Sequence, residues 1–194
     1  MILGKVKDRI MKQKSLNLTA GGSKENRREL DFYPTPPEVT IALMEFLKLP
    51  ECEIWEPACG SGAMVEIFEK YGHLVKATDI TTGCDFLTTK GSADAIITNP
   101  PFNLSEKFIE KALKEAPIVA MVLKSQYWHA KKRFRLFSEN KPAYILPLTW
   151  RPDFLNGERG GSPTMEVIWT VWIKGNTECK YIPLNKPETN PTLF

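Results

Sequence analysis

The tetrapeptide Asn99–Phe102 (Asn-Pro-Pro-Phe) contains residue types suited to binding a planar ring that carries an amino group. It follows the short apolar run Ala95–Thr98, which predicts a buried strand. The two prolines end that strand, because they lack a backbone N–H and fix φ. The Asn99 side chain and the Pro100 carbonyl are then rigid acceptors for the two N–H bonds of an amine, and Phe102 can stack on the ring. Taken alone, the tetrapeptide also fits a turn that only ends a strand.

A second motif, Glu56–Gly62 (Glu-Pro-Ala-Cys-Gly-Ser-Gly), lies between the predicted strand Cys52–Trp55 and the predicted helix Ala63–Tyr71. Glycine lets a ligand approach the backbone, so such a turn can cradle a nucleotide. The third glycine of a dinucleotide fingerprint is absent, which disfavours a diphosphate cofactor. Asp79 ends the next predicted strand, Leu74–Thr78, where a carboxylate can accept both ribose hydroxyls. Each feature alone fits a plain turn or cap, but together they favour an adenosine-bearing cofactor without a diphosphate.

The elements that position these motifs alternate between strand and helix patterns from Asp31 onward, which predicts an α/β domain with a mainly parallel sheet. Thr35–Glu38 predicts a capping box with proline at the first helical position. Further helices are expected at Ser105–Ala116 and Tyr127–Phe137, and further strands at Ile118–Leu123, Tyr144–Leu148 and Met165–Ile173. The last two strands have no helical pattern between them, which predicts an antiparallel pair at the sheet edge.

Composition excludes several classes of protein. The 194 residues fit one domain, and they contain no apolar run long enough for a membrane span and no secretory segment, so a cytoplasmic protein is expected. Four cysteines without a CxxC pair and only two histidines predict no metal site and no histidine-centred triad. The net charge is +3, but residues 1–30 hold eight basic and three acidic side chains. This N-terminal arm fits either a polyanionic partner or a solvated leader.

The motifs together resemble the S-adenosylmethionine-dependent amino-methyltransferases, in particular the adenine-N6 DNA methyltransferases. Asp31–Pro36 is similar to their N-terminal motif and Glu56–Gly62 to their glycine motif, and Asp79-Ile80, Asp85–Leu87 and Asn99–Phe102 follow in family order. The resemblance covers roughly residues 31–174. It implies a Rossmann-like class I methyltransferase fold, with a mainly parallel seven-stranded sheet, an antiparallel edge strand and helices on both faces. Residues 175–194 are then a C-terminal tail.

The resemblance also implies a set of cofactor-binding residues, drawn from all of these motifs: Tyr33, Thr35, Pro36, Glu56, Pro57, Ala58, Cys59, Gly60, Gly62, Asp79, Ile80, Asp85, Phe86 and Asn99. Within this set Thr35 would hold the methionine carboxylate of S-adenosylmethionine. Glu56, Ala58 and the glycine turn would surround its methionine and ribose portions. Asp79 would take the ribose hydroxyls, and Ile80 would lie against the adenine ring.

Asp85 and Phe86 would contact the cofactor adenine by the same resemblance, a turn residue being the alternative for Asp85. The catalytic motif would be Asn99, Pro100, Pro101 and Phe102, which binds the target amine. Two acceptors on the hydrogens of the amine favour a pyramidal nitrogen whose lone pair points at the sulfonium methyl. No metal is needed for this reaction. Cytosine-C5 methylation would need a Pro-Cys dipeptide, which the sequence lacks.

On the substrate side, a base in a duplex must be flipped out or supplied unpaired. Phe102 would form one stacking wall and Trp150 or Phe154 the other, with Trp128 a weaker candidate and core packing the alternative for each tryptophan. A basic run could grip phosphates or be a solvated helix face: Lys131, Lys132, Arg133 and Arg135.

Substrate choice follows less directly from the sequence. Only 13 residues separate Asp85 from Asn99, so no target-recognition domain is inserted there, and relaxed specificity or an accessory partner is expected. The leading hypothesis is a small stand-alone DNA adenine-N6 methyltransferase, of the kind carried by phages and restriction-modification systems. An RNA adenine-N6 methyltransferase is the closest alternative. The others are a protein-glutamine methyltransferase, which the basic segments disfavour, and a catalytically silent nucleic-acid-binding subunit.

Overall fold

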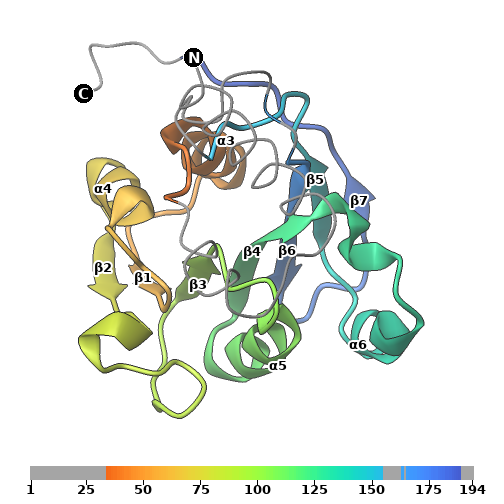
Figure 1. The fold of residues 1–194 in the computed structure, drawn as a ribbon, viewed down its shortest axis with the longest axis horizontal. Coiled ribbons are helices and arrows are strands. Elements are labelled where there is room, and N and C mark those ends of the chain that lie inside the picture. The colour runs from red at the N-terminus through yellow and green to blue at the C-terminus, as the bar shows by residue number, and fades with distance from the viewer. Residues whose placement is uncertain (1–33, 155–162, 164, 189–194) are drawn as a thin grey trace, which may run out of the picture. The chain divides into compact units, whose positions relative to one another are not determined.

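Seven strands form one sheet in the computed structural model, in the order β2-β1-β3-β4-β6-β5-β7 (Figure 1). The structure describes residues 34–154, 163 and 165–188, which belong to one compact unit of the chain. The expected basic arm, residues 1–30, lies outside the described residues. The strands are β1 (Glu53–Glu56), β2 (Leu74–Ala77), β3 (Ala95–Thr98), β4 (Ile118–Lys124), β5 (Tyr144–Pro147), β6 (Val167–Ile173) and β7 (Lys180–Tyr181).

The sheet is mainly parallel, as predicted. β1 pairs in parallel with β2 and β3, β3 pairs in parallel with β4, and β5 pairs in parallel with β7. Only β6 runs the other way, antiparallel to both β4 and β5. The prediction of an antiparallel strand was correct, but its place at the edge was wrong. Because β6 lies between two strands and is covered on both faces, its sequence is almost uniformly apolar rather than alternating.

The segment after β6 differs from the expected tail. β7 pairs with β5, and Leu184 forms a further bridge with Leu148, so residues 180–184 extend the sheet. The two residues of β7 are both exposed, so neither length nor hydrophobic alternation marked this strand in the sequence.

Helices cover both faces of the sheet (Figure 1), as the resemblance implied. They are α3 (Pro37–Leu47), α4 (Ala63–Lys70), α5 (Ser105–Glu115) and α6 (Phe134–Glu139), with short 3-10 turns η1 (Ile80–Thr82), η2 (Ser125–Trp128) and η3 (Lys131–Arg133). Two tryptophans of β6 show the two faces. The Trp169 indole donates to the Val39 carbonyl of α3 at 2.9 Å, and the Trp172 indole donates to the Asn140 carbonyl after α6 at 2.8 Å. Residues three apart in a strand point to opposite faces.

Two local predictions were wrong. Pro37 begins α3, so proline does occupy the first helical position, but no side chain caps the helix and Thr35 makes a different contact. The predicted helix Tyr127–Phe137 is broken into η2, η3 and α6. The Tyr127 carbonyl, which a continuous helix would pair with a backbone amide, instead accepts from the Arg133 guanidinium at 2.7 Å.

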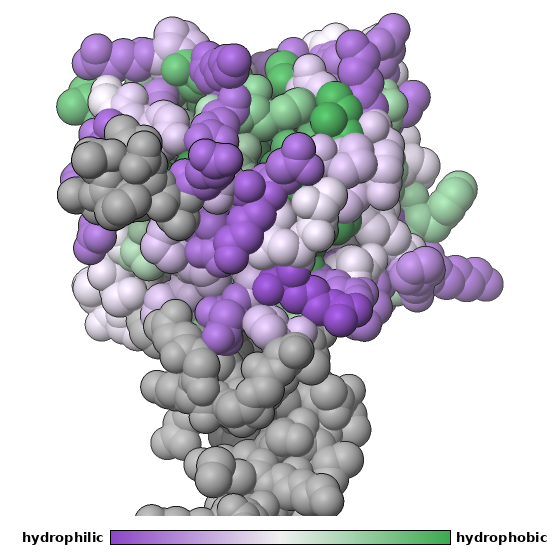
Figure 2. Space-filling view, turned by 90° about the horizontal axis from the view of Figure 1, so that it is seen from above, coloured by the Kyte–Doolittle hydropathy of each residue, from purple (hydrophilic) through white to green (hydrophobic). Residues whose placement is uncertain are grey.

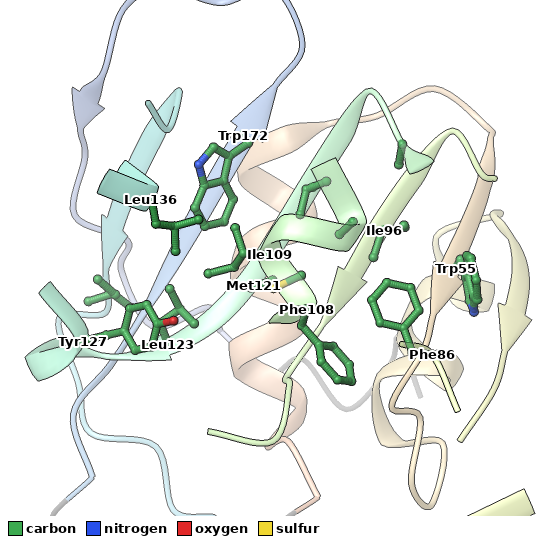
Figure 3. Packing of buried hydrophobic residues seen from close by; sticks show 14 residues of the cluster. Trp55, Phe86, Ile96, Phe108, Ile109, Met121, Leu123, Tyr127, Leu136 and Trp172 are labelled. Atoms are coloured by element: carbon green, nitrogen blue, oxygen red, sulfur yellow. The ribbon is translucent and has the colours of Figure 1, made fainter. Parts of the chain in front are cut away.

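A row of buried side chains crosses the sheet on the α5 side and fixes the strands that carry the site. Trp55, Ile96, Val119 and Trp172 are neighbours across β1, β3, β4 and β6, as the strand register gives them. Figure 3 shows side chains of this core, which α5 and α6 cover with Phe108, Ile109 and Leu136. Each such side chain contributes about 1.5–3 kcal/mol when fully buried. The outer surface differs: on the face in Figure 2, hydrophobic residues form small areas among hydrophilic ones.

Candidate active site

The carboxyl ends of four adjacent parallel strands bring the predicted motifs to one edge of the sheet. Glu56 is the last residue of β1, Asp79 follows β2, Asn99 follows β3 and Lys124 ends β4. In the sheet these strands are neighbours in the order β2-β1-β3-β4. Open α/β sheets bind ligands at this edge. The structure therefore gathers residues that are up to 68 positions apart in the sequence, from Glu56 to Lys124.

The turn after β1 is held in a shape that leaves its backbone accessible. Gly60 and Gly62 have φ of 51° and 87°, the left-handed region that favours glycine. The Cys59 amide donates to the Thr78 carbonyl at 3.0 Å, which ties the turn to the end of β2. A Cβ added at Gly62 would meet no atom within 4 Å, so the space beside the start of α4 is open. The turn that the glycine motif predicted is thus present, and its role as a nucleotide cradle stays a prediction.

Asp79 links that turn to the end of β2. Its Oδ2 accepts from the Gly60 amide at 2.9 Å, and its Oδ1 accepts from the Thr81 amide and hydroxyl at 2.9 and 2.6 Å. Burial by itself would raise the pKa of Asp79, but the hydrogen bonds from Thr81 and Gly60 outweigh it and lower the pKa. Asp79 thus acts as a cap and stays ionised. With one partner among the described residues, Oδ2 keeps a lone pair for a sugar hydroxyl.

Glu56 has a buried carboxyl group, one oxygen of which has no partner among the described residues. The side chain is 2% exposed, and its Oε2 accepts no hydrogen bond from the described residues. Burial, and after it the negative charge of Asp79, raise the pKa of Glu56 well above its usual value. A buried polar group without a partner destabilises the fold, so a ligand that donates to it or carries positive charge would be favoured here. The ammonium group of a methionine moiety fits this requirement.

The remaining residues predicted for the cofactor separate into different environments. Ile80 is 67% exposed beside Asp79 and presents an apolar surface that a ring could cover. Asp85 caps a turn by accepting from the Leu87 amide at 2.9 Å, which was its alternative role. Phe86 is 1% exposed and lies in the core, with its ring centroid 5.1 Å from that of Trp55. Its side chain therefore belongs to the core and not to the open edge.

The Asn99–Phe102 turn carries the two acceptors that were predicted to bind an amine, and their hydrogen bonds differ. The Asn99 side-chain amide donates to the Thr35 hydroxyl at 3.1 Å, and no described residue donates to its Oδ1. The Pro101 carbonyl accepts from the Leu104 amide and from the Ser105 hydroxyl, whereas the Pro100 carbonyl accepts no hydrogen bond within the described part of the chain. Oδ1 of half-buried Asn99 and the carbonyl of buried Pro100 thus have no donor among the described residues.

Two contacts at this turn were not predicted from the sequence. The Lys124 ammonium lies 4.3 Å from the centroid of the Phe102 ring, so it sits over the predicted stacking wall. Buried Ser105 donates to the carbonyls of Pro101 and Phe102, both at 3.2 Å, and so holds the turn. Lys124 could have been found from its place at the end of a predicted strand. No sequence pattern assigns Ser105 this contact.

The predicted substrate residues lie in different environments. Half-buried Trp150 lines a groove next to β5 and β6, together with Ser125, Leu148, Arg151, Glu166 and Ile168. Phe154 is buried, so it offers no open ring face. Lys131 and Lys132 are exposed in η3. Arg133 is held instead, because its guanidinium lies 3.8 Å from the centroid of the Tyr127 ring and bonds the carbonyl of the same residue.

The remaining predicted site residues include some that lie outside the described part of the chain. Tyr33 and residues 155–162 and 164 lie outside the described residues. Pro36 and Pro57 are buried beside the site, and Ala58 and Cys59 are half-buried. Burial, followed by the charges of Glu56 and Asp79, raises the pKa of Cys59.

In the described part of the chain no group of three His, Cys, Asp or Glu residues is placed to hold a metal, and no helix is long and apolar enough to cross a membrane.

Comparison with known proteins supports the fold but not a family. No family model and no curated protein matches the sequence. Solved structures do match. A candidate RNA methyltransferase from Pyrococcus horikoshii is 16% identical, over 73% of this chain and 86% of that chain, with a TM-score of 0.54. A candidate class I S-adenosylmethionine-dependent methyltransferase from Listeria monocytogenes is 14% identical, over 96% of this chain and 75% of that chain, with a TM-score of 0.57.

A third similar structure is the modification subunit of a candidate type I restriction enzyme from Vibrio vulnificus YJ016. It is 15% identical with a TM-score of 0.57, and the match covers 97% of this chain but only 52% of that chain. At such identities the likeness concerns the fold. The protein therefore has the Rossmann-like α/β fold of the class I methyltransferases.

Proposed function

We propose that this protein transfers a methyl group from S-adenosylmethionine to the exocyclic N6 of adenine in DNA. The observation that carries the proposal is the position of two available acceptors, Asn99 Oδ1 and the Pro100 carbonyl, at the end of β3. β3 pairs with β1, which leads into the glycine turn, and β1 pairs on its other side with β2, which Asp79 follows. A nucleoside cradle and an amine-binding turn on adjacent strands suit transfer between a cofactor and an amino group.

The residues of the cradle fit S-adenosylmethionine, which supplies an electrophilic methyl group on its sulfonium when bound. The unpartnered carboxyl of Glu56 would accept from its ammonium group. The Thr35 hydroxyl accepts from Asn99, so its own proton remains for the cofactor carboxylate. Asp79 Oδ2 would accept from a ribose hydroxyl, and exposed Ile80 would cover the adenine ring.

The target amine would be bound through both of its hydrogens. Asn99 Oδ1 and the Pro100 carbonyl accept one each, which favours a pyramidal nitrogen with its lone pair directed away from the acceptors. These acceptors are fixed before the substrate arrives, because Thr35 holds the Asn99 amide and the prolines hold the turn. Phe102 would stack on the base, with Trp150 on the open groove as a second aromatic contact. The base must be flipped out or unpaired to reach this turn.

DNA is proposed as the substrate on the basis of the sequence motifs, with the exposed Lys131 and Lys132 and the basic residues 1–30 as phosphate contacts. Similarity to the Vibrio vulnificus modification subunit supports this choice at the level of the fold. Because the chain spans about half the length of that subunit, an accessory specificity partner is part of the proposal. Similarity to the Pyrococcus horikoshii protein keeps RNA as the second candidate.

In the deciding experiment the protein is incubated with S-adenosylmethionine and with unmethylated duplex DNA, single-stranded DNA or RNA of matched sequence. Each polymer is then digested to nucleosides and analysed by mass spectrometry. N6-methyladenine mainly in DNA is the expected result, and RNA methylation alone would replace the proposal by the second candidate. If S-adenosylmethionine binds but no nucleoside is methylated, either the substrate is a protein or a partner is required. In that case the chain alone does not methylate DNA, and the proposal is wrong unless an added specificity partner restores N6-methyladenine in DNA.

A further inference from the structure

Phe134 is the most exposed large hydrophobic residue in the described part of the chain, with 76% of its surface open. It is the first residue of α6 and lines a groove together with Trp128, Lys131, Arg133, Phe137 and Ser138. An exposed aromatic ring offers a large apolar face on which another ring can stack, and Phe134 shares its groove with two further aromatic residues, Trp128 and Phe137. This groove is separate from the one that Trp150 lines.

The charges around Phe134 favour an anionic partner. Residues 131–139 contain four basic side chains and one acidic side chain. Arg135 pairs with Glu139 at 2.8 Å, whereas exposed Lys131 and Lys132 form no ion pair with a described residue. An exposed ring beside unpaired lysines suits a single strand of nucleic acid, whose bases stack on aromatic rings while its phosphates meet cations.

The groove is firmly built, so a base would meet a preformed surface. The Arg133 guanidinium donates to the Tyr127 carbonyl at 2.7 Å and lies over the ring of the same residue. On the other wall, the rings of Trp128 and Phe137 have centroids 4.0 Å apart and planes inclined by 30°. Binding to a fixed surface costs less conformational entropy than binding to a mobile one.

Only a short segment of chain separates the groove from a residue of the candidate active site. Lys124 ends β4 and lies over Phe102, the predicted stacking wall for the target base. The turn η2 starts at the next residue and ends at Trp128, which already lines the groove. A strand whose target base reaches the Asn99–Phe102 turn would thus find basic and aromatic side chains along the segment that follows β4.

We infer that Phe134 is a stacking platform for an unpaired base that flanks the target base of the nucleic-acid substrate, with Lys131 and Lys132 beside the adjacent phosphates. The inference rests on the proposed function, since it assumes a polynucleotide substrate. It adds a contact outside the active site, on a residue that no motif of the sequence marks. A single-stranded substrate, or a duplex opened around the target base, would supply such a base.

Binding of labelled single-stranded DNA, single-stranded RNA and blunt duplex DNA to the full-length chain, measured by fluorescence anisotropy without cofactor, tests the inference. We expect Phe134→Ala to weaken single-strand binding at least about fivefold, the effect typical of losing one stacked base. Phe134→Tyr, which keeps the ring, should bind as the wild type does. Tyr181→Ala is the matched control, because Tyr181 is 68% exposed on β7, away from any basic run.

The salt dependence separates stacking from charge. Phe134→Ala should leave the slope of log Kd against log salt concentration unchanged. Lys131→Gln and Lys132→Gln should each make that slope less steep by up to about 1. If the wild type and Phe134→Ala bind single strands with equal affinity, the inference is wrong, and a protein partner becomes the better candidate for the groove. An equal loss for blunt duplex would exclude an unpaired base and also overturn it. If the wild type binds no polynucleotide at all, the proposed function itself fails.

Discussion

The Asn99 side-chain amide donates to the Thr35 hydroxyl at 3.1 Å. This bond joins the first and the last of the predicted cofactor and catalytic motifs along the sequence. An amide has its donors and its acceptor on opposite sides, so this bond decides which way Asn99 Oδ1 faces. Thr35 is buried, so it holds the amide from inside the protein. A residue expected to bind the cofactor therefore also orients the residue expected to bind the target amine.

Replacing Thr35 should separate these two roles. Thr35→Val keeps the shape and removes the hydroxyl, so we expect kcat for methyl transfer at saturating cofactor to fall about tenfold, the value of one hydrogen bond. Thr35→Ser should retain most of the rate. The dissociation constant of S-adenosylhomocysteine is measured in parallel by calorimetry. A loss of cofactor affinity with unchanged kcat would contradict the orienting role.

Asn99→Ala should lower methyl transfer by about 100-fold or more, because it removes one of the two acceptors that polarise the amine. Cofactor affinity should change little, since the cradle is formed by other strands. Asn103→Ala is the control, as Asn103 is exposed in the same turn. Rates are followed by transfer of radiolabelled methyl groups. If the variant is as active as the wild type, Asn99 is not part of the catalytic site.

Glu56 should make the ligand-free protein less stable as the pH rises. Below its ordinary pKa of 4.5 the carboxyl is protonated in both folded and unfolded chains. Above this pH the unfolded chain ionises while the folded protein holds the proton, because its pKa is raised, so the free energy of unfolding falls by up to ~1.4 kcal/mol per pH unit. Glu56→Gln should remove this loss, as urea unfolding between about pH 5 and pH 8 would measure.

The same residue predicts a proton effect on binding. A ligand ammonium beside Glu56 favours the ionised carboxylate, so cofactor binding should release a proton in the wild type but not in Glu56→Gln. Calorimetry in two buffers with different ionisation enthalpies measures the release. Glu66→Gln, on the exposed face of α4, is the control for both Glu56 experiments. Equal proton release by the wild type and Glu56→Gln would remove Glu56 from the cofactor site.

Gly91 should tolerate no side chain, for reasons of space. A Cβ there would lie 2.6 Å from Cζ3 of Trp55 and 2.6 Å from the Lys76 ammonium. Lys76 can move, but Trp55 is fully buried in the core. Gly91→Ala should therefore destabilise the protein by about 1–3 kcal/mol, whereas the exposed neighbour Ser92→Ala should be neutral. Thermal unfolding compares the two, and an unchanged melting temperature for Gly91→Ala would mean that the loop relaxes freely.

Local chemistry explains why much of the site could be predicted from the sequence. Prolines after a short apolar run must end β3, and glycines with positive φ must form the turn after β1, because these constraints act within a few residues. The mainly parallel sheet followed in the same way from alternating strand and helix patterns. The prediction that the Asn99–Phe102 turn accepts hydrogen bonds from an amine needed only these local rules.

The tertiary structure decided the contacts that join distant segments. The residues around Thr35 in the sequence predict that its hydroxyl caps the helix that follows, whereas in the structure it contacts Asn99. No local pattern predicts that the Lys124 ammonium lies over the ring of Phe102. Phe86 is buried against Trp55, and β6 lies inside the sheet, because of packing between strands. Sequence periodicity predicts where strands occur but not their order in the sheet. The sequence by itself indicated the polar groups at the strand ends, Glu56, Asp79 and Asn99, because the backbone constraints that end a strand are local. The fold decided which way they face, because side-chain orientation depends on neighbours from other strands.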